Sequence, residues 1–134
     1  MSCFEQALEV LEELAPRSRA AARVCTNIGE VWLARGDIGR ALAFCQRGLD
    51  LAQARAPGST GTANALNQLG LVHLGSGDVE DALGLFGRAL AIAEAIAPHN
   101  AQTVKALDNL AAAHRARGEN EVAENYVQRA RDAK

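Results

Sequence analysis

The sequence predicts an all-α fold built from repeated pairs of antiparallel helices, and three observations lead to this prediction. Residues that favour helices, such as Ala, Leu, Arg and Glu, outnumber Val, Ile and Thr, and aromatic residues make up only 4% of the chain. A glycine followed by an acidic residue occurs at 36–37, 77–78 and 118–119, with a constant step of 41 residues. The segments between these pairs carry apolar residues at the spacing of amphipathic helices.

Length and charge limit the classes of fold and function. A chain of 134 residues has the size of one ordinary domain and can bury a core without disulfides or a structural metal. The formal net charge is -2 with both signs interspersed, so no basic stripe is present to neutralise phosphates. We therefore expect a single domain over residues 1–134 that has no nucleic-acid partner.

The sequence contains no recognisable targeting, membrane-spanning or disulfide pattern. The N-terminal residues lack the basic start and apolar core of a signal peptide, and charges interrupt every apolar stretch well short of a membrane span. Cys3, Cys25 and Cys45 are odd in number and match neither a zinc site nor a redox pair. We expect reduced thiols, with Cys3 nearest to solvent and the other two in the core, in a cytoplasmic protein with no metal, cofactor or membrane contact.

Further residue types recur at the same step and define the repeat. Small residues, alanines, arginines and prolines fall in register without a gap, at Gly29/Gly70/Ala111, Ala41/Ala82/Ala123, Arg47/Arg88/Arg129 and Pro16/Pro57/Pro98. This register divides the chain into a half-repeat at 1–17 and repeats at 18–58, 59–99 and 100–134. A period of this length is typical of a solenoid, in which each unit packs on its neighbours.

Start and stop signals divide each repeat into two helices. The first helix of each pair is expected to start after Ser18, Ser59 or Asn100, whose side chains accept a hydrogen bond from a free N–H of the first turn. It ends near a glycine, which readily adopts the left-handed conformation that closes a helix. The acidic residue that follows stabilises the start of the second helix. The seven expected helices are 2–15, 19–35, 38–55, 60–76, 79–96, 101–117 and 120–133.

Two glycines lie in the middle of expected first helices and indicate close packing. Gly29 and Gly70 each cost about 1 kcal/mol relative to alanine at such a position, and a cost repeated at one register implies a structural reason. We expect them to face Ala41 and Ala82 of the second helix, so that the two backbones approach closely. This arrangement is typical of an antiparallel helical hairpin.

These columns resemble the tetratricopeptide repeat, a family of helix-pair repeats. The family's common repeat has about 34 residues, so a step of 41 is similar to the long-repeat subclass of kinesin light chains and G-protein-modulating polarity adaptors. The resemblance implies a right-handed superhelical solenoid whose concave face is lined by the first helices. The second copy matches the family pattern best, with Leu66, Leu69, Gly70, His73, Ala82, Phe86 and Ala89 in the matching columns.

The sequence carries no recognisable catalytic signature. It contains no phosphate-binding glycine loop, His-Glu-x-x-His helix or nucleophile elbow. His73 and His114 occupy the column that Trp32 holds in the first copy, so we interpret them as packing residues, not as metal ligands or an acid/base pair. We therefore expect no enzymatic activity.

The first helices carry the expected partner-binding surface. Opposite the core columns, Asn27, Gln68 and Asn109 align as a column of amides, each with a hydrogen-bond donor and an acceptor. Neighbouring helices lie about 10 Å apart and an extended peptide advances about 3.3 Å per residue, so one amide would bind the ligand backbone about every third residue. A merely solvated polar face is the alternative. The full expected set is Arg23, Asn27, Glu30, Asn64, Asn67, Gln68, Leu71, Lys105, Asp108, Asn109, Ala112 and Arg115.

The ends of the array suggest a second hypothesis. Three apolar columns become polar together in the last helix, at Asn120, Glu124 and Arg131, which favours a solvent-facing end of the solenoid. At the other end, the unpaired helix 2–15 would leave an apolar edge that a second copy of the chain would cover. We therefore predict an adaptor that binds a partner peptide or helix in its concave groove, with a self-associating structural module as the alternative.

Overall fold

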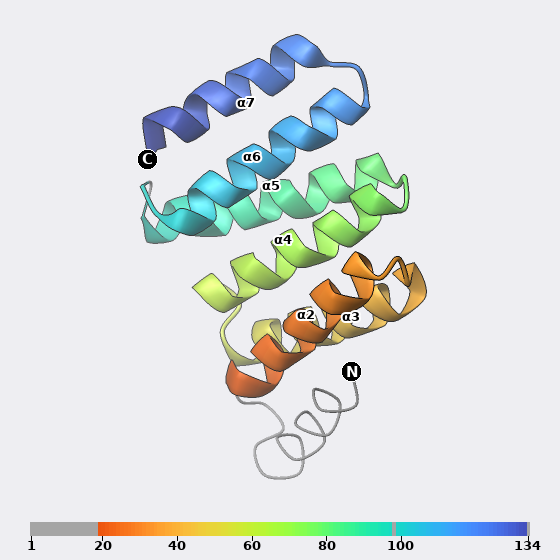
Figure 1. Ribbon diagram of the computed structural model, residues 1–134. Helices are drawn as coiled ribbons and strands as arrows, with labels where there is room; N and C mark the ends of the chain where they lie inside the picture. Colours follow the sequence, from red (N-terminus) through yellow and green to blue (C-terminus); the bar gives the residue numbers. More distant parts are fainter. Residues whose placement is uncertain (1–18, 98, 134) are drawn as a thin grey trace.

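The computed structural model describes residues 19–97 and 99–133 (Figure 1). These residues form helices and turns without a strand, so the all-α prediction is confirmed. The expected helix 2–15, Ser18 and Cys3 lie outside the described residues. The helices are α2 (Arg19–Ala34), α3 (Ile38–Arg55), α4 (Thr60–Gly75), α5 (Val79–Ile96), α6 (Ala101–Ala116) and α7 (Asn120–Ala133).

The helix ends follow the local signals of the sequence. At the starts of α4 and α6, Ser59 Oγ accepts from the Thr62 N–H at 3.2 Å and Asn100 Oδ1 accepts from the Thr103 N–H at 2.8 Å. The first helices end one residue earlier than expected, at Ala34, Gly75 and Ala116. The glycine two residues after each end makes a shorter-range bond, as in Gly77 N–H to Leu74 O at 3.2 Å. The closing glycines adopt φ values of 82°, 93° and 79° at Gly36, Gly77 and Gly118.

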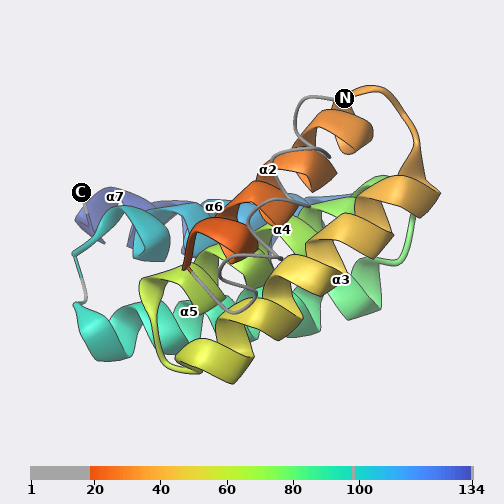
Figure 2. The ribbon, with the colours of Figure 1, turned by 90° about the horizontal axis from the view of Figure 1, so that it is seen from below.

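The helices form two layers. In Figure 1, α2, α4 and α6 lie in front of α3 and α5, and the view from below in Figure 2 separates the layer of α2, α4 and α6 from that of α3 and α5. Each first helix packs on the second helix of its own pair, and each second helix also packs on the next first helix. The chain therefore stacks hairpins in sequence order.

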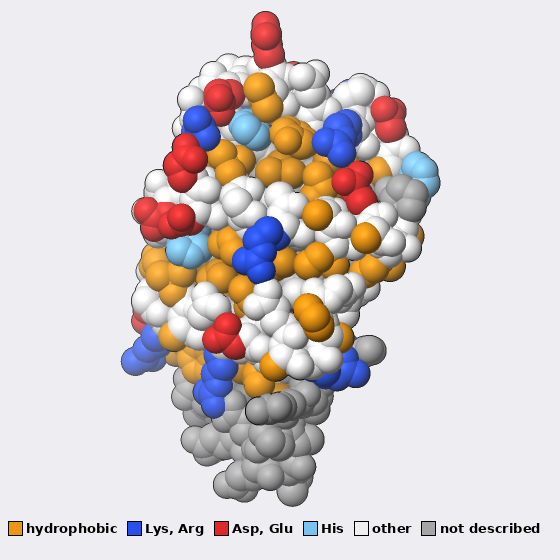
Figure 3. Space-filling model, turned by 180° about the vertical axis from the view of Figure 1, so that it is seen from behind, with side chains coloured by type: hydrophobic (Ala, Val, Ile, Leu, Met, Phe, Trp, Pro, Cys, Tyr) orange, Lys and Arg blue, Asp and Glu red, His pale blue; other side chains and the backbone are white. Residues whose placement is uncertain are grey.

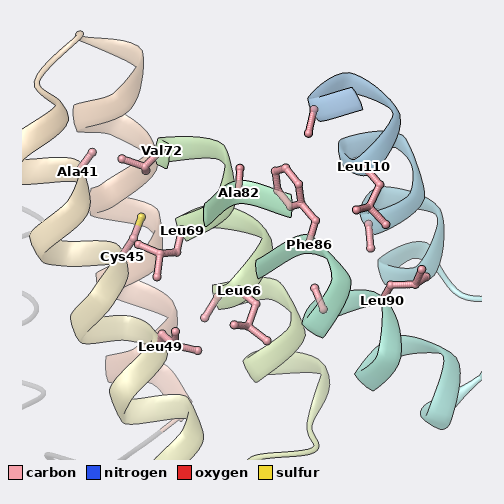
Figure 4. Packing of buried hydrophobic residues seen from close by; sticks show 14 of the residues in the cluster. Ala41, Cys45, Leu49, Leu66, Leu69, Val72, Ala82, Phe86, Leu90 and Leu110 are labelled. Atoms are coloured by element: carbon pink, nitrogen blue, oxygen red, sulfur yellow. The ribbon is translucent and has the colours of Figure 1, made fainter. Parts of the chain in front are cut away.

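The core runs continuously between these layers. Ile28, Leu66, Phe86 and Leu107 are almost completely buried and come from α2, α4, α5 and α6. Figure 4 shows Cys45 of α3 pointing toward Leu69 of α4, across the junction between the first two described pairs. Cys25 and Cys45 are buried, as expected for small apolar residues in the core.

The two mid-helix glycines allow close packing, but not mainly against the residues expected. A Cβ atom at Gly70 would lie 2.5 Å from Phe86 Cε1, and one at Gly29 would clash with Cys45 Sγ. The expected approach to the alanines is seen at Gly29, where the backbone oxygen of Ala41 lies 3.3 Å from the Cβ position, whereas the three atoms nearest to the Cβ position of Gly70 all belong to Phe86. The reason is geometric: Phe86 and Cys45 lie one turn further along the second helix, and helical side chains tilt toward the N-terminus of their helix.

Candidate functional site: the groove of the first helices

The spacing of the helices determines which face is concave. Helix α2 approaches α4, and α4 approaches α6. Among the described residues, α3 does not approach α5 in the same way, nor does α5 approach α7. A row of elements that lie closer together forms the inner side of a curved array. The first helices therefore line the concave side, and the second helices lie on the outer side.

Ten of the twelve predicted binding residues retain some exposure on the first helices. Asn64, Leu71 and Asn109 are half-buried. Those that are well exposed are Arg23, Asn27, Glu30, Lys105, Asp108, Ala112 and Arg115. Of the charged members, Arg115 already pairs with Glu124 of α7, with Arg115 Nη2 at 3.4 Å from Glu124 Oε1. The exposed set thus offers both charge and amide groups along the groove.

Asn67 and Gln68 are instead buried, with exposed fractions of 0% and 5%. Helix α4 lies between α2 and α6, so its flanks are covered from both sides. Asn67 uses its amide to connect the helices: its Nδ2 donates to Gln102 Oε1, and its Oδ1 accepts from Asn109 Nδ2, both at 3.4 Å. The expected amide column is therefore not uniformly accessible, since Asn27 is exposed, Gln68 is buried, and Asn109 is half-buried and already donates to Asn67.

A cleft of about 670 Å³ lies where the first helices begin. It is lined from all three first helices, from the C-terminal part of α3 and from the turn between α3 and α4. Small residues form much of its floor: a Cβ at Gly48, for example, would lie 2.7 Å from Thr26 Cγ2. The described lining residues are Ala22, Arg23, Thr26, Gly48, Ala52, Arg55, Gly58, Ser59, Thr60, Gly61, Asn64, Ala65, Ile96 and Gln102.

The charge of this cleft differs from that of the whole chain. Arg23 and Arg55 are its only charged residues among the described lining, and both are exposed. Neither forms an ion pair with another described residue. Seen from behind, by contrast, the surface carries acidic and basic side chains interspersed (Figure 3). The cleft is therefore locally basic in a chain of net charge -2.

Sequence reasoning placed only Arg23 and Asn64 among the residues of this cleft. It missed Arg55, Ser59, Thr60 and Gln102 because it considered only the outward face of the first helices. The turns between repeats carried a usable signal, since the Pro-Gly-Ser sequence at 57–59 places small residues directly before a first helix. Residues of such turns lie at the open end of the groove.

The comparison with known families agrees with this architecture. A model of the family described as tetratricopeptide repeat matches residues 18–95 and 61–134, which together span most of the chain. The chain belongs to the tetratricopeptide repeat family. Tetratricopeptide repeats are generally protein–protein interaction modules, and repeat families of this kind are typically non-enzymatic scaffolds that bind protein partners. No curated protein matches this chain in sequence.

Solved structures show the same tetratricopeptide-type solenoid. BtubC (BKLC) from P. vanneervenii is 26% identical with a TM-score of 0.84, and the match covers 97% of this chain and 53% of that one. A putative kinesin light chain from Podosopora anserina, described as having nearly identical TPR-like repeats, is 16% identical with a TM-score of 0.79, covering 97% and 63%. The TPR domain of Arabidopsis FLU is 19% identical with a TM-score of 0.73, covering 81% and 90%. This chain thus spans about half the length of BtubC.

Among the described helices, none combines the length and the apolarity needed to cross a membrane.

Proposed function

We propose that this chain is an adaptor that binds a partner protein through an extended, acidic peptide segment held in the groove of the first helices. The observation that carries the proposal is the cleft of about 670 Å³, which is lined by two unpaired arginines and no described acidic residue. A surface that is open, concave and locally basic favours a ligand that carries carboxylates.

Each part of the cleft suits one part of such a ligand. The guanidinium groups of Arg23 and Arg55 present paired N–H donors that match a carboxylate. Asn64 of the cleft, and Asn27 on α2 outside its lining, offer amide donors and acceptors to the peptide backbone. Ile96, whose side chain is 49% exposed, offers an apolar contact at the edge. The proposed binding site is thus centred on the N-terminal ends of the first helices and not on the amide column.

The proposal is tested by selecting peptides from a random displayed library on the wild-type chain. Selected peptides should be enriched in Asp and Glu, and their affinity should be measured for wild type and for the double variant Arg23→Glu/Arg55→Glu. Hydrogen bonds to charged groups contribute about 1.5–3 kcal/mol each, so the double variant should bind at least about tenfold more weakly.

A matched control makes the same change of charge on the outer helices. Arg88 and Arg131 are exposed on α5 and α7 and form no described ion pair, so Arg88→Glu/Arg131→Glu should retain wild-type affinity. Equal weakening in both double variants would show a general charge effect and contradict groove binding. Selection of peptides whose affinity is unaffected by the cleft variant would contradict it as well.

The alternative of self-association rests on the helix expected at 2–15, which lies outside the described residues. Light scattering at several protein concentrations distinguishes the two hypotheses. An adaptor that uses its groove should remain monomeric as concentration rises, whereas an assembly module should show a mass that increases.

A further inference from the structure

Three side chains with metal-ligand atoms converge at the turn between α4 and α5. His73 Nδ1 lies 3.7 Å from Asp78 Oδ2 and 4.0 Å from Asp81 Oδ2. One such atom from each of the three residues lies within 4.8 Å of the other two. His73 Nδ1 is itself fully buried and has no hydrogen-bond partner in the structure. A buried polar atom without a partner requires an explanation, because its desolvation is otherwise uncompensated.

The turn itself holds these three residues together. His73 lies in the last turn of α4, and its carbonyl accepts a hydrogen bond from the Asp78 N–H at 2.8 Å. Asp78 and Asp81 are three residues apart at the start of α5, so they lie on the same face of that helix. Asp78 makes no side-chain capping bond to α5. Asp78 Oδ2 accepts from Ser76 Oγ at 3.3 Å and also lies 3.7 Å from His73 Nδ1.

At the equivalent positions of the third repeat, the histidine and the acidic residue are in direct contact. There, His114 Nδ1 is 3.0 Å from Glu119 Oε1, and the His114 ring stacks on Tyr126. The third residue of the set is Val122, which offers no ligand. The longer side chain of Glu119 reaches its histidine directly, whereas Asp78 stops short of His73. The second repeat therefore has a longer distance between the histidine and the first carboxylate, and it has one more carboxylate nearby.

We propose that His73, Asp78 and Asp81 form a binding site for a divalent transition-metal ion, with Zn²⁺ as the representative ion. His73 Nδ1 and one oxygen from each carboxylate are the protein ligands, and water completes the coordination because both aspartates are exposed. A point at equal distance from these three ligand atoms lies about 2.5 Å or less from each of them. If the three side chains move toward that point by a few tenths of an ångström, the distances reach the ~2.0–2.2 Å of zinc bonds.

This site is separate from the groove. It lies at the turn that joins α4 to α5, whereas the cleft is lined by the turn between α3 and α4 and by Ile96 and Gln102, near the turn between α5 and α6. A bound ion would join the end of α4 to the start of α5 and compensate the repulsion between two neighbouring carboxylates. It also gives His73 a role that differs from the packing role expected from the sequence.

The test is a titration of the full chain with Zn²⁺ by calorimetry, in a Cys3→Ser background that removes one thiol as a competing ligand. Long-range ¹H–¹⁵N spectra of the histidine rings identify the ligand. We expect one ion per chain, with the ring signals of His73 shifting and those of His99 and His114 unchanged. Asp81→Asn, and Asp78→Asn/Asp81→Asn, should weaken binding by more than about tenfold, since changes even outside the ligand set cost metal sites that much.

The control is Glu119→Gln/Glu121→Gln, which removes two negative charges from the corresponding segment of the third repeat and should bind Zn²⁺ like wild type. Circular dichroism of each variant confirms that it is folded. Because Asp81 is 70% exposed and outside the capping position, Asp81→Asn should fold even if the double variant does not. Equal affinity of wild type and Asp81→Asn, a shift of another histidine ring, or no ring shift at millimolar Zn²⁺ would each overturn the proposal.

Discussion

Cys45 illustrates how burial changes the chemistry of a single residue. Its thiol is enclosed between α2, α3 and α4, and a Cβ at Gly29 would collide with its sulfur. Desolvation is the main cause that raises its pKa to about 12, and the negative charge of Glu30 and the neighbouring Cys25 thiol add to the shift. The reactive thiolate is therefore strongly disfavoured in the folded chain.

At the residue scale, we expect iodoacetamide at about pH 8 to spare Cys45 in the native protein, because an ordinary cysteine with a pKa near 8.5 is partly ionised there and Cys45 is not. Mass spectrometry of the peptide that contains Cys45 measures this, with the urea-unfolded chain as the control. Alkylation at equal rates in the native and unfolded chains would contradict the prediction.

Glu119 provides a pH-dependent prediction. The hydrogen bond with His114 is the main cause that lowers the pKa of Glu119, and Arg117 contributes to the shift. A lowered folded pKa means that ionised Glu119 stabilises the fold above its unfolded pKa of about 4.3, and this contribution is lost as the pH falls through the folded value. The difference in unfolding free energy between wild type and Glu119→Gln should therefore shrink from about pH 6 to about pH 3. Urea denaturation at several pH values checks this, and a constant difference would contradict it.

At the scale of the element, the α4–α5 hairpin depends on one close contact. Gly70 has no Cβ atom, and the ring of Phe86 occupies the space that a Cβ would take. Two carbons of the ring lie 2.5 and 2.7 Å from the Cβ position. In the third repeat the same two columns hold Ala111 and Val127, a larger residue opposite a smaller one. The two hairpins thus share the same register but pack residues of different sizes at these two positions.

Gly70→Ala should therefore destabilise the chain although alanine favours helices. Overpacking costs about 1–3 kcal/mol, which exceeds or offsets the gain of about 1 kcal/mol in helix propensity. In a Phe86→Val background the clash is removed, and the same change should be neutral or stabilising. Chemical denaturation of the two single variants and the double variant gives the coupling energy. Additive effects would show that Gly70 and Phe86 do not interact in this way.

At the scale of the whole molecule, the groove exists because the first helices lie closer together than the second helices. Asn67 is part of this inner row, since it joins α4 to α6 through Gln102 and Asn109. A fully buried amide with partners on the next hairpin contributes to the junction between repeats. The inner face of the first helices therefore both lines the groove and stabilises the junction between repeats.

Asn67→Ala should lower the free energy of unfolding by about 1–3 kcal/mol, because it removes a fully buried amide and its hydrogen bonds to the half-buried Gln102 and Asn109. The matched control is Asp108→Ala, in the same column one repeat later, where the side chain is exposed and the expected cost is about 0.5 kcal/mol or less. Urea denaturation compares the two variants. Similar small losses would indicate that Asn67 does not stabilise the contact between α4 and α6.

The helices and their pairing follow from the sequence alone, because the responsible signals are local. Ser59 and Asn100 cap helices with their own side chains, and Gly36 closes one by its positive φ, so their effects need no distant partner. The repeated step of these signals then specified hairpins stacked in order, and their column pattern indicated the family.

The accessibility of each polar residue, and the contacts between side chains of different helices, depend instead on how the helices pack. Asn67 and Gln68 share a helix face with exposed neighbours, yet α2 and α6 cover them, and no local pattern encodes the distance between first helices. Arg55 comes from the last turn of a second helix, yet it lines the cleft together with residues of the first helices. The difference between His73 and His114 likewise depends on side-chain reach across a turn, a matter of about one ångström that residue spacing does not specify.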